Sequence, residues 1–231
     1  MKKLLFSVCA AIAVWGCGGG DDVGGLPCLS CEDNGGDGDD GGYTGSYGSL
    51  QYGGQTYKTV KIGSQTWFAE NLNYNVASGG KCYGNSEYNC YAYGRLYNWS
   101  AAMGLSPGCN SNTCAEQIQS KHRGICPEGW HIPSDGDWDV LISYAGGYSV
   151  AGRYLGSSEW GGTDQYGFAA MPGGGGSGSG FSNIELHGYW WTASEINSEL
   201  AYYRLMLYSE EGAYWNYYDK SNFFSVRCLK N

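Results

Sequence analysis

The segment Ala213–Asp219 gathers the side chains of this sequence that are best suited to hold a ligand. In an extended strand Trp215 and Tyr217 share one face, while Asn216 and Tyr218 share the other. Aromatic rings stack on the apolar faces of pyranose sugars, and amide or carboxylate groups bond the hydroxyls. We therefore expect one face of this strand to pack on the core and the other to present a ligand platform.

A second aromatic pair, Trp190-Trp191, sits in another strand-like segment. Adjacent strand residues point to opposite faces. We expect one of the two rings to be core and the other to be available to a ligand. The candidate ligand-binding residues are thus Trp190, Trp191, Trp215, Asn216, Tyr217 and Tyr218.

Ten cysteines suggest a disulfide framework. Two of them belong to the N-terminal signal described below, which leaves eight, an even number that is typical of an oxidising compartment. Spacing favours two local pairs and one long-range pair, although eight cysteines allow 105 pairings. The expected pairs are Cys82 with Cys90, Cys109 with Cys114, and Cys126 with Cys228.

Catalytic and metal-binding patterns are weak. Cys28 and Cys31 form a CxxC, but no second CxxC or histidine pair accompanies them, so a local disulfide or free thiols are the favoured interpretation. The acids Glu210 and Glu211 sit in an apparent turn, where a solvated tip is favoured over an acid–base pair. The three histidines are scattered, and no hydrolase, zinc-protease or phosphate-loop motif occurs. We expect no enzymatic activity and no resident metal.

The N-terminus is that of an exported protein. Lys2 and Lys3 precede an apolar run, Leu4–Trp15, which is too short to span a bilayer and has the layout of a secretory signal. The run ends at Gly16-Cys17, which resembles a bacterial lipobox. We expect a signal peptide over residues 1–16 and lipidation of Cys17, with an ordinary secretory signal as the alternative.

Residues 17–49 are predicted to form a flexible acidic tether between the lipid and a domain at 50–231. The segment is rich in Gly and Asp and holds seven acids and no Lys or Arg, so it cannot bury enough apolar surface to fold. The remaining domain is only mildly acidic, with 15 acids and 11 bases. That balance argues against nucleic-acid binding. The predicted location is the outer membrane or cell surface, and the leaflet is left open.

The elements that must position these residues are short. A hairpin is expected from Gln55–Ile62 and Gln65–Ala69. A helix is expected over Tyr93–Met103, stopped by Gly104. A second helix begins at Ser134, which forms a capping box with Asp137. Its core stripe is Trp138, Leu141, Ile142 and Ala145.

The last third of the chain begins with a Gly-rich segment, which is followed by segments with strand patterns. Gly173–Gly180 holds only Gly and Ser and is predicted to be a flexible loop. The expected strands are 189–194, 201–209, 213–218 and 223–230. The last of these places Cys228 toward the core. Two helices followed by an antiparallel meander make a single α+β domain.

Several segments together resemble the Fibrobacter major paralogous domain family, often called FISUMP. They are Gln65–Leu72, Tyr93–Trp99, Cys126–Ser134, Tyr189–Glu195 and Ser225–Cys228. The resemblance covers residues 50–231 and implies an exported, often lipidated protein of bacterial surfaces, without an established activity. A more distant likeness, to the C-type lectin fold and formylglycine-generating-enzyme-like domains, implies the fold alone.

Two departures limit what the distant likeness implies. Trp215-Asn216 stands thirteen residues before Cys228, similar to the calcium motif of sugar-binding lectins, but Tyr217 replaces its Asp. Calcium needs six or more oxygen ligands, so calcium-dependent binding is the weaker alternative. The copper-binding cysteine pair of the enzyme group is also unmatched.

The sequence therefore predicts a membrane-anchored envelope protein that binds extracellular polysaccharide or mediates adhesion. The alternatives are a structural protein that binds other envelope proteins and a divergent enzyme of the formylglycine-generating-enzyme-like fold.

Overall fold

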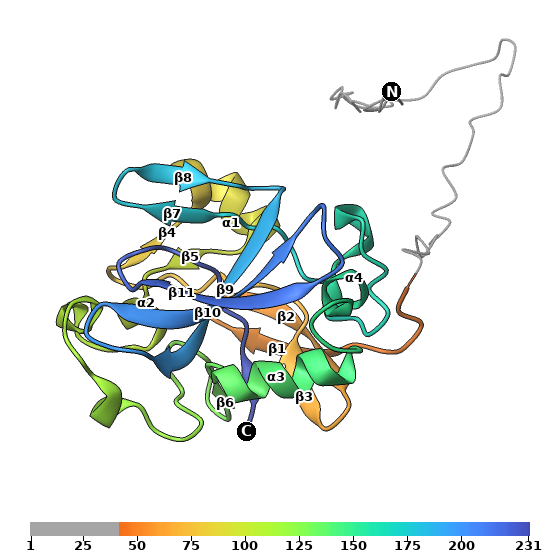
Figure 1. Ribbon diagram of the computed structural model, residues 1–231, viewed down its shortest axis with the longest axis horizontal. Coiled ribbons are helices and arrows are strands. Elements are labelled where there is room, and N and C mark those ends of the chain that lie inside the picture. Colours follow the sequence, from red (N-terminus) through yellow and green to blue (C-terminus); the bar gives the residue numbers. More distant parts are fainter. Residues whose placement is uncertain (1–41) are drawn as a thin grey trace, which may run out of the picture. The chain divides into compact units, whose positions relative to one another are not determined.

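The computed structural model describes residues 42–231, an α+β domain whose strands all pair antiparallel (Figure 1). The signal peptide, Cys17, Cys28, Cys31 and most of the predicted tether lie outside the described residues. The first strand begins at Gly48, two residues before the expected start of the domain. Within the described part, no helix is both long enough and apolar enough to cross a bilayer.

One sheet joins the two ends of the described chain. Its order is β1-β2-β3-β12-β6, so the C-terminal strand lies between β3 and β6. Its strands are β1 Gly48–Tyr52, β2 Gln55–Ile62, β3 Gln65–Phe68, β6 Trp130–His131 and β12 Leu229–Lys230. The β2–β3 hairpin confirms the predicted one, with Gly63 at positive φ in its turn.

A second sheet is a three-stranded meander in the order β11-β10-β9. Its strands are β9 His187–Glu195, β10 Leu200–Leu207 and β11 Ala213–Asp219, close to three of the predicted strands. The fourth predicted strand, 223–230, is wrong: only β12 is a strand there, and it belongs to the other sheet. The preceding residues form only single bridges, such as Tyr97 to Phe224, because they thread through the core between elements.

Residues 42–231 contain four α-helices where two were expected. They are α1 Glu87–Tyr93, α2 Trp99–Ala102, α3 Asp135–Tyr144 and α4 Ala151–Leu155. Short 3-10 helices occur at Tyr83–Asn85, Pro107–Asn110, Ala115–Gln117 and Ser158–Trp160.

The helix predicted over Tyr93–Met103 is wrong. The backbone leaves the helix at Gly94, whose φ is +80° and where a Cβ would lie 2.6 Å from Cβ of Asn71. The next residues form β5 Leu96–Tyr97, paired with β4 Gly80–Lys81. Asn98 then caps the four-residue α2 by accepting the Ala101 N–H. Helical periodicity was present, but pairing across the fold overrode it.

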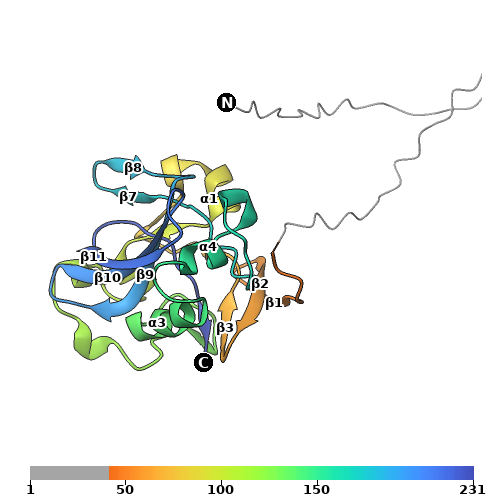
Figure 2. The same cartoon turned by 45° about the vertical axis from the view of Figure 1, so that its right-hand side comes forward.

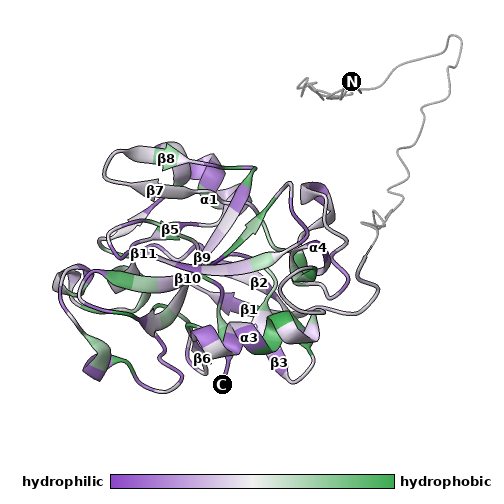
Figure 3. Ribbon diagram, viewed as in Figure 1, coloured by the Kyte–Doolittle hydropathy of each residue, from purple (hydrophilic) through white to green (hydrophobic). Residues whose placement is uncertain are grey.

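Helix α3 confirms its predicted cap and core stripe. Ser134 and Asp137 form the capping box, and Trp138, Leu141 and Ile142 are fully buried. Hydrophilic and hydrophobic residues alternate along the helix in Figure 3. Together with α4, α3 lies between the three-stranded sheet and the β2–β3 hairpin, as Figure 2 shows.

The segment Gly173–Gly180, predicted to be a flexible loop, forms part of a hairpin. Its strands are β7 Gly175–Ser177 and β8 Gly180–Ser182. The small residues serve close packing here: a Cβ on Gly175 would lie 3.0 Å from the Phe224 ring. From the sequence these glycines predicted a flexible loop, whereas in the fold their lack of a side chain allows close packing.

All three disulfides expected from the cysteine spacing are present. The Cys126–Cys228 bond spans 102 residues and lies in the core, with both cysteines fully buried. It ties the segment before β6 to the segment before β12.

A buried arginine joins the segments on either side of this bond. Arg227 donates to Oδ1 of Asn71 at 2.8 Å, and to the carbonyls of Phe68, Phe168 and Ala169. Burial lowers the pKa of the Arg227 guanidinium to about 9. Asn71 also accepts the indole N–H of Trp190 at 2.8 Å. We call the group formed by Arg227 and its neighbours the Arg227 cage. Its other members are Phe68, Asn71, Phe168, Ala169 and Trp190.

Candidate functional site

Strand β11 is the edge of the three-stranded sheet, and it is the most exposed strand of the domain. Every residue in it except Ala213 is exposed. Trp215, Tyr217 and Tyr218 are 51%, 49% and 52% exposed. Such a run of exposed aromatic rings is unusual, because large apolar side chains stabilise a fold most when they are buried.

The sequence predicted that one face of this strand would pack on the core, and that expectation is wrong. From Tyr214 to Asp219 every residue of β11 is exposed, so both of its faces reach solvent. The core lies under β9 and β10 instead, where both faces of the sheet are buried. Side chains that alternate along β11 therefore point to two faces that are both exposed, and neither face is buried.

On the first face, Trp215 lies across from Arg204 and Tyr217 across from Tyr202. The rings of Tyr202 and Trp215 meet edge to face, with centroids 5.8 Å apart. We call Tyr202, Trp215 and Tyr217 the aromatic row. It offers a surface of rings beside solvent, as a sugar platform requires.

A charged cluster lies beside the row on the same face of the sheet. Arg204 is buried, and its Nη2 lies 2.5 Å from Oδ1 of Asp135 and 2.8 Å from Oδ1 of Asp139. Burial raises the pKa of Asp135, although Arg204 opposes that rise. Tyr148 donates to Asp139 and accepts from Arg204. These contacts fix β10 against α3, so the row stands on a rigid base.

On the second face, Asn216 is exposed and its Oδ1 accepts the N–H of Tyr217 at 2.8 Å. Tyr218 partly packs, with its ring 6.4 Å from Tyr203 and 6.3 Å from Phe224. Tyr214, on the same face, is 37% exposed, so this face offers an amide and two rings.

Trp190 and Trp191 do not belong to this surface. Both are fully buried, on opposite faces of β9, and each ring fills a different core cluster. The indole of Trp191 donates to the carbonyl of Tyr97 at 2.8 Å. Their prediction as ligand-binding residues was wrong because β9, unlike β11, is covered on both sides.

The far end of β11 is held by a buried ion pair. Lys220 is fully buried and donates to Glu195, and its Nζ lies 4.7 Å from the Trp99 ring. Glu195 also accepts the backbone N–H of Cys114 at 3.0 Å. The pair thus links the end of β9, the Cys109–Cys114 loop and the turn that leaves β11.

The histidines occupy separate structural contacts. His131 bonds Asn231 at 2.7 Å, His122 bonds the carbonyl of Met103 at 2.8 Å, and His187 bonds the hydroxyl of Tyr189 at 2.6 Å.

Among the residues that the structure describes, the group of three or more metal-ligating side chains is Cys82, Glu87 and Cys90. Both sulfurs are in a disulfide, so they are not thiolate ligands.

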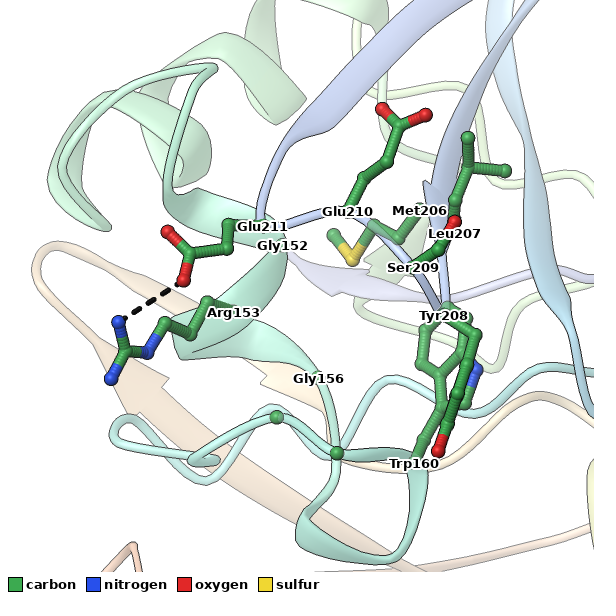
Figure 4. Close-up of a pocket in the computed structure, with 12 residues that line it drawn as sticks. Gly152, Arg153, Gly156, Trp160, Met206, Leu207, Tyr208, Ser209, Glu210 and Glu211 are labelled. Carbon is green, nitrogen blue, oxygen red and sulfur yellow. Dashed lines mark hydrogen bonds and ion pairs between the residues drawn. The ribbon is translucent and has the colours of Figure 1, made fainter. Parts of the chain in front are cut away.

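A pocket opens at the other end of the β10–β11 hairpin, between its turn and α4 (Figure 4). Its volume is about 340 Å³, and Tyr208, Glu210 and Glu211 of the turn line one part of it. Sequence reasoning had treated the two acids as a solvated tip. The spacing of Gly152, Gly156 and Gly161-Gly162 was the only signal of a close backbone approach there.

The fold and the disulfides define a class: a disulfide-braced α+β domain with two antiparallel sheets and an aromatic edge strand. Residues 60–230 match the family model of the Fibrobacter succinogenes major domain. The match spans most of the chain, which therefore belongs to that family. Comparison with curated proteins and with solved structures finds no match.

Proposed function

We propose that this chain is an exported, lipid-anchored protein of the cell envelope whose domain binds extracellular polysaccharide through β11. The observation that carries the proposal is the exposure of β11: six of its seven residues are exposed, and four of those are aromatic. Rings at solvent can stack on pyranose faces, while Asn216 and Asp219 can bond hydroxyls.

The aromatic row is the stronger half of this surface. Trp215 presents the largest exposed ring on β11. Its ring contacts Tyr202 edge to face, and the Arg204 cluster lies beside it on the same face. Preorganised rings lose little conformational freedom when a ligand binds, which favours affinity. A linear polysaccharide lying along the strand would contact Trp215 and Tyr217 in turn.

Export and the lectin-like architecture are parts of the same proposal. The Lys-rich start, the apolar run and Gly16-Cys17 support export and lipidation. Three disulfides in one domain support an oxidising compartment. The return of β12 beside β3, braced by Cys126–Cys228, supports the likeness to C-type lectins.

The test is binding of the full chain, purified in detergent, to insoluble polysaccharides and to a glycan array, with and without EDTA. We expect binding that falls at least about tenfold in Trp215→Ala, which corresponds to roughly 1.4 kcal/mol. Tyr91→Ala is the control, because Tyr91 is an exposed aromatic residue on α1, away from β11. Loss of binding in EDTA would make calcium part of the site.

The proposal fails if the full chain binds no glycan in either format, or if Trp215→Ala and Tyr91→Ala bind as well as the parent. Folding of each variant is checked by its near-ultraviolet circular dichroism, since the buried tryptophans report on packing.

A second candidate is a structural role in which another envelope protein pairs with β11. The observation that favours it is the edge itself: a seven-residue edge strand without Lys or Pro offers unpaired backbone groups to a partner strand. Backbone pairing would tolerate Trp215→Ala far better than stacking on a sugar would. Retention of a cross-linked protein partner by that variant, without glycan binding, would favour this role.

A further inference from the structure

The pocket beside the β10–β11 turn is separate from the aromatic row and carries its own chemistry. Its volume of about 340 Å³ falls within the range of small-molecule sites. It lies between α4 and the turn, whereas the row lies further along β11.

The back of the pocket is closed by glycines whose backbones touch. A Cβ on Gly162 would lie 2.1 Å from the carbonyl oxygen of Gly156, and one on Gly152 would lie 2.1 Å from that of Gly212. No side chain fits at those contacts. A ligand must therefore enter from the solvent side, and the closed back suits the end of a chain better than its middle.

Two aromatic residues line one side of the pocket in Figure 4. Tyr208 is 61% exposed, and a Cβ on Gly161 would lie 3.7 Å from its ring, so the ring stands against the glycine wall. Trp160 is 7% exposed, and its indole N–H has no hydrogen-bond partner among the described residues. The wall thus combines the exposed ring of Tyr208 with the largely buried ring of Trp160.

The opposite side of the pocket is charged. Nη1 of Arg153 lies 3.2 Å from Oε1 of Glu211, and both side chains are at least half exposed. Glu210 hydrogen-bonds Tyr214, and that contact, followed by burial, raises the pKa of the Tyr214 hydroxyl. A guanidinium beside a carboxylate offers donors and acceptors to neighbouring hydroxyls. Two carboxylates disfavour acidic sugars, and the guanidinium disfavours amines.

We propose that this pocket binds the terminal pyranose of a neutral glycan. The sugar ring lies on Tyr208, and its hydroxyls bond Arg153 and Glu211. The choice of ligand class rests on the proposed function, but the site is distinct from β11. Trp215 follows Glu211 by four residues, roughly 13 Å at about 3.3 Å per residue, so a chain seated in the pocket can continue toward the aromatic row.

The two sites are told apart by ligand size. The full chain in detergent is titrated with methyl glycosides of glucose, galactose, mannose and N-acetylglucosamine, followed by ligand-detected NMR. Glucuronate and glucosamine serve as charged probes. We expect at least one neutral glycoside to bind, and Tyr208→Ala and Glu211→Gln to weaken it at least about tenfold. The control Tyr91→Ala should leave its affinity unchanged.

Three results would overturn the pocket and leave the proposed function standing. The first is binding of polysaccharide without binding of any neutral glycoside. The second is glycoside binding that is lost in Trp215→Ala and kept in Tyr208→Ala, which places the sugar on β11. The third is a preference for glucosamine, which makes the pocket a cation site. Absence of binding to both glycosides and polysaccharides overturns both proposals.

Discussion

The Arg227 cage and strand β11 lie in the same domain and use polar and aromatic groups in opposite ways. In the cage, a fully buried guanidinium donates four hydrogen bonds, and Asn71 accepts from both Arg227 and Trp190. Along β11, four aromatic side chains are exposed. The polar groups of the cage stabilise the fold, whereas the aromatic groups of β11 remain exposed to solvent.

This difference matches the pattern of resemblance to the family. The segments Gln65–Leu72 and Ser225–Cys228, by which the chain resembles its relatives, contribute Asn71 and Arg227 to the cage. Strand β11 lies outside every such segment. The family match over residues 60–230 covers both regions, and the ligand chemistry that we propose lies outside the two segments that contribute to the cage. Variants of the two regions should separate stability from binding.

The largest expected effect is on the long-range disulfide. Replacing both Cys126 and Cys228 by Ser should lower the free energy of unfolding by about 4–5 kcal/mol, because the bond closes a loop of about 100 residues in the unfolded chain. Urea denaturation measures the change. The Cys109→Ser, Cys114→Ser pair is the control: its short loop predicts a loss of about 2 kcal/mol. Equal losses would contradict the loop-entropy argument.

Next is the cage. Arg227→Met should lower the free energy of unfolding by about 3 kcal/mol, because Asn71 and three buried carbonyls lose their donor. Arg227→Lys should restore little of it, since an ammonium cannot reach the same acceptors. Urea denaturation measures both. A change below about 1 kcal/mol would mean that water or repacking satisfies the cage, and glycan binding by the folded fraction should stay unchanged.

A smaller effect is expected at the start of α3, and it depends on pH. Burial raises the pKa of Asp137, but the His131 nitrogen 3.6 Å away and two hydrogen bonds from Ser134 outweigh it and lower that pKa to about 2. The resulting stability is present above about pH 4 and is lost as the pH falls through about 2.

Asp137→Asn should therefore cost about 1 kcal/mol at neutral pH, discounted because the carboxyl is partly exposed. The gap between parent and variant should close near pH 2. Urea denaturation across this pH range measures it, and a gap that persists at pH 2 would assign the effect to something other than the charge of Asp137.

The smallest effect on stability is expected in β11. Trp215→Ala with Tyr217→Ala should change the free energy of unfolding by no more than about 0.5 kcal/mol, since both rings are half exposed. Trp191→Ala, on a buried ring of the same sheet, should cost about 3–5 kcal/mol. Thermal and urea unfolding of the two variants give the contrast. A large loss in the β11 variant would make its rings structural.

Local signals in the sequence predicted what depends on local geometry. The capping box of α3, its core stripe, the β2–β3 hairpin and the disulfide pairs all follow from spacing between nearby residues or from counting. The helix over Tyr93–Met103 did not survive, because Tyr97 pairs with Phe224, which is far away in the chain.

The sequence predicted only part of the candidate site. The alternation of Ala213–Asp219 identified an aromatic strand, but burial on each face depends on what packs above and below the strand, and those elements come from elsewhere in the chain. Trp190 and Trp191 looked equally available, yet β9 is covered on both sides. The pocket was missed because Arg153, Trp160 and Tyr208 come together only when α4 meets the β10–β11 turn.

The sequence by itself determined the family through the resemblance of its motif segments. Composition, spacing and short-range periodicity determined the α+β class, the cysteine framework and the kinds of side chain available for binding. Tertiary structure decided which aromatic rings reach solvent and which polar groups are buried together. Exposure is a property of what packs against a residue, and those neighbours come from distant parts of the chain.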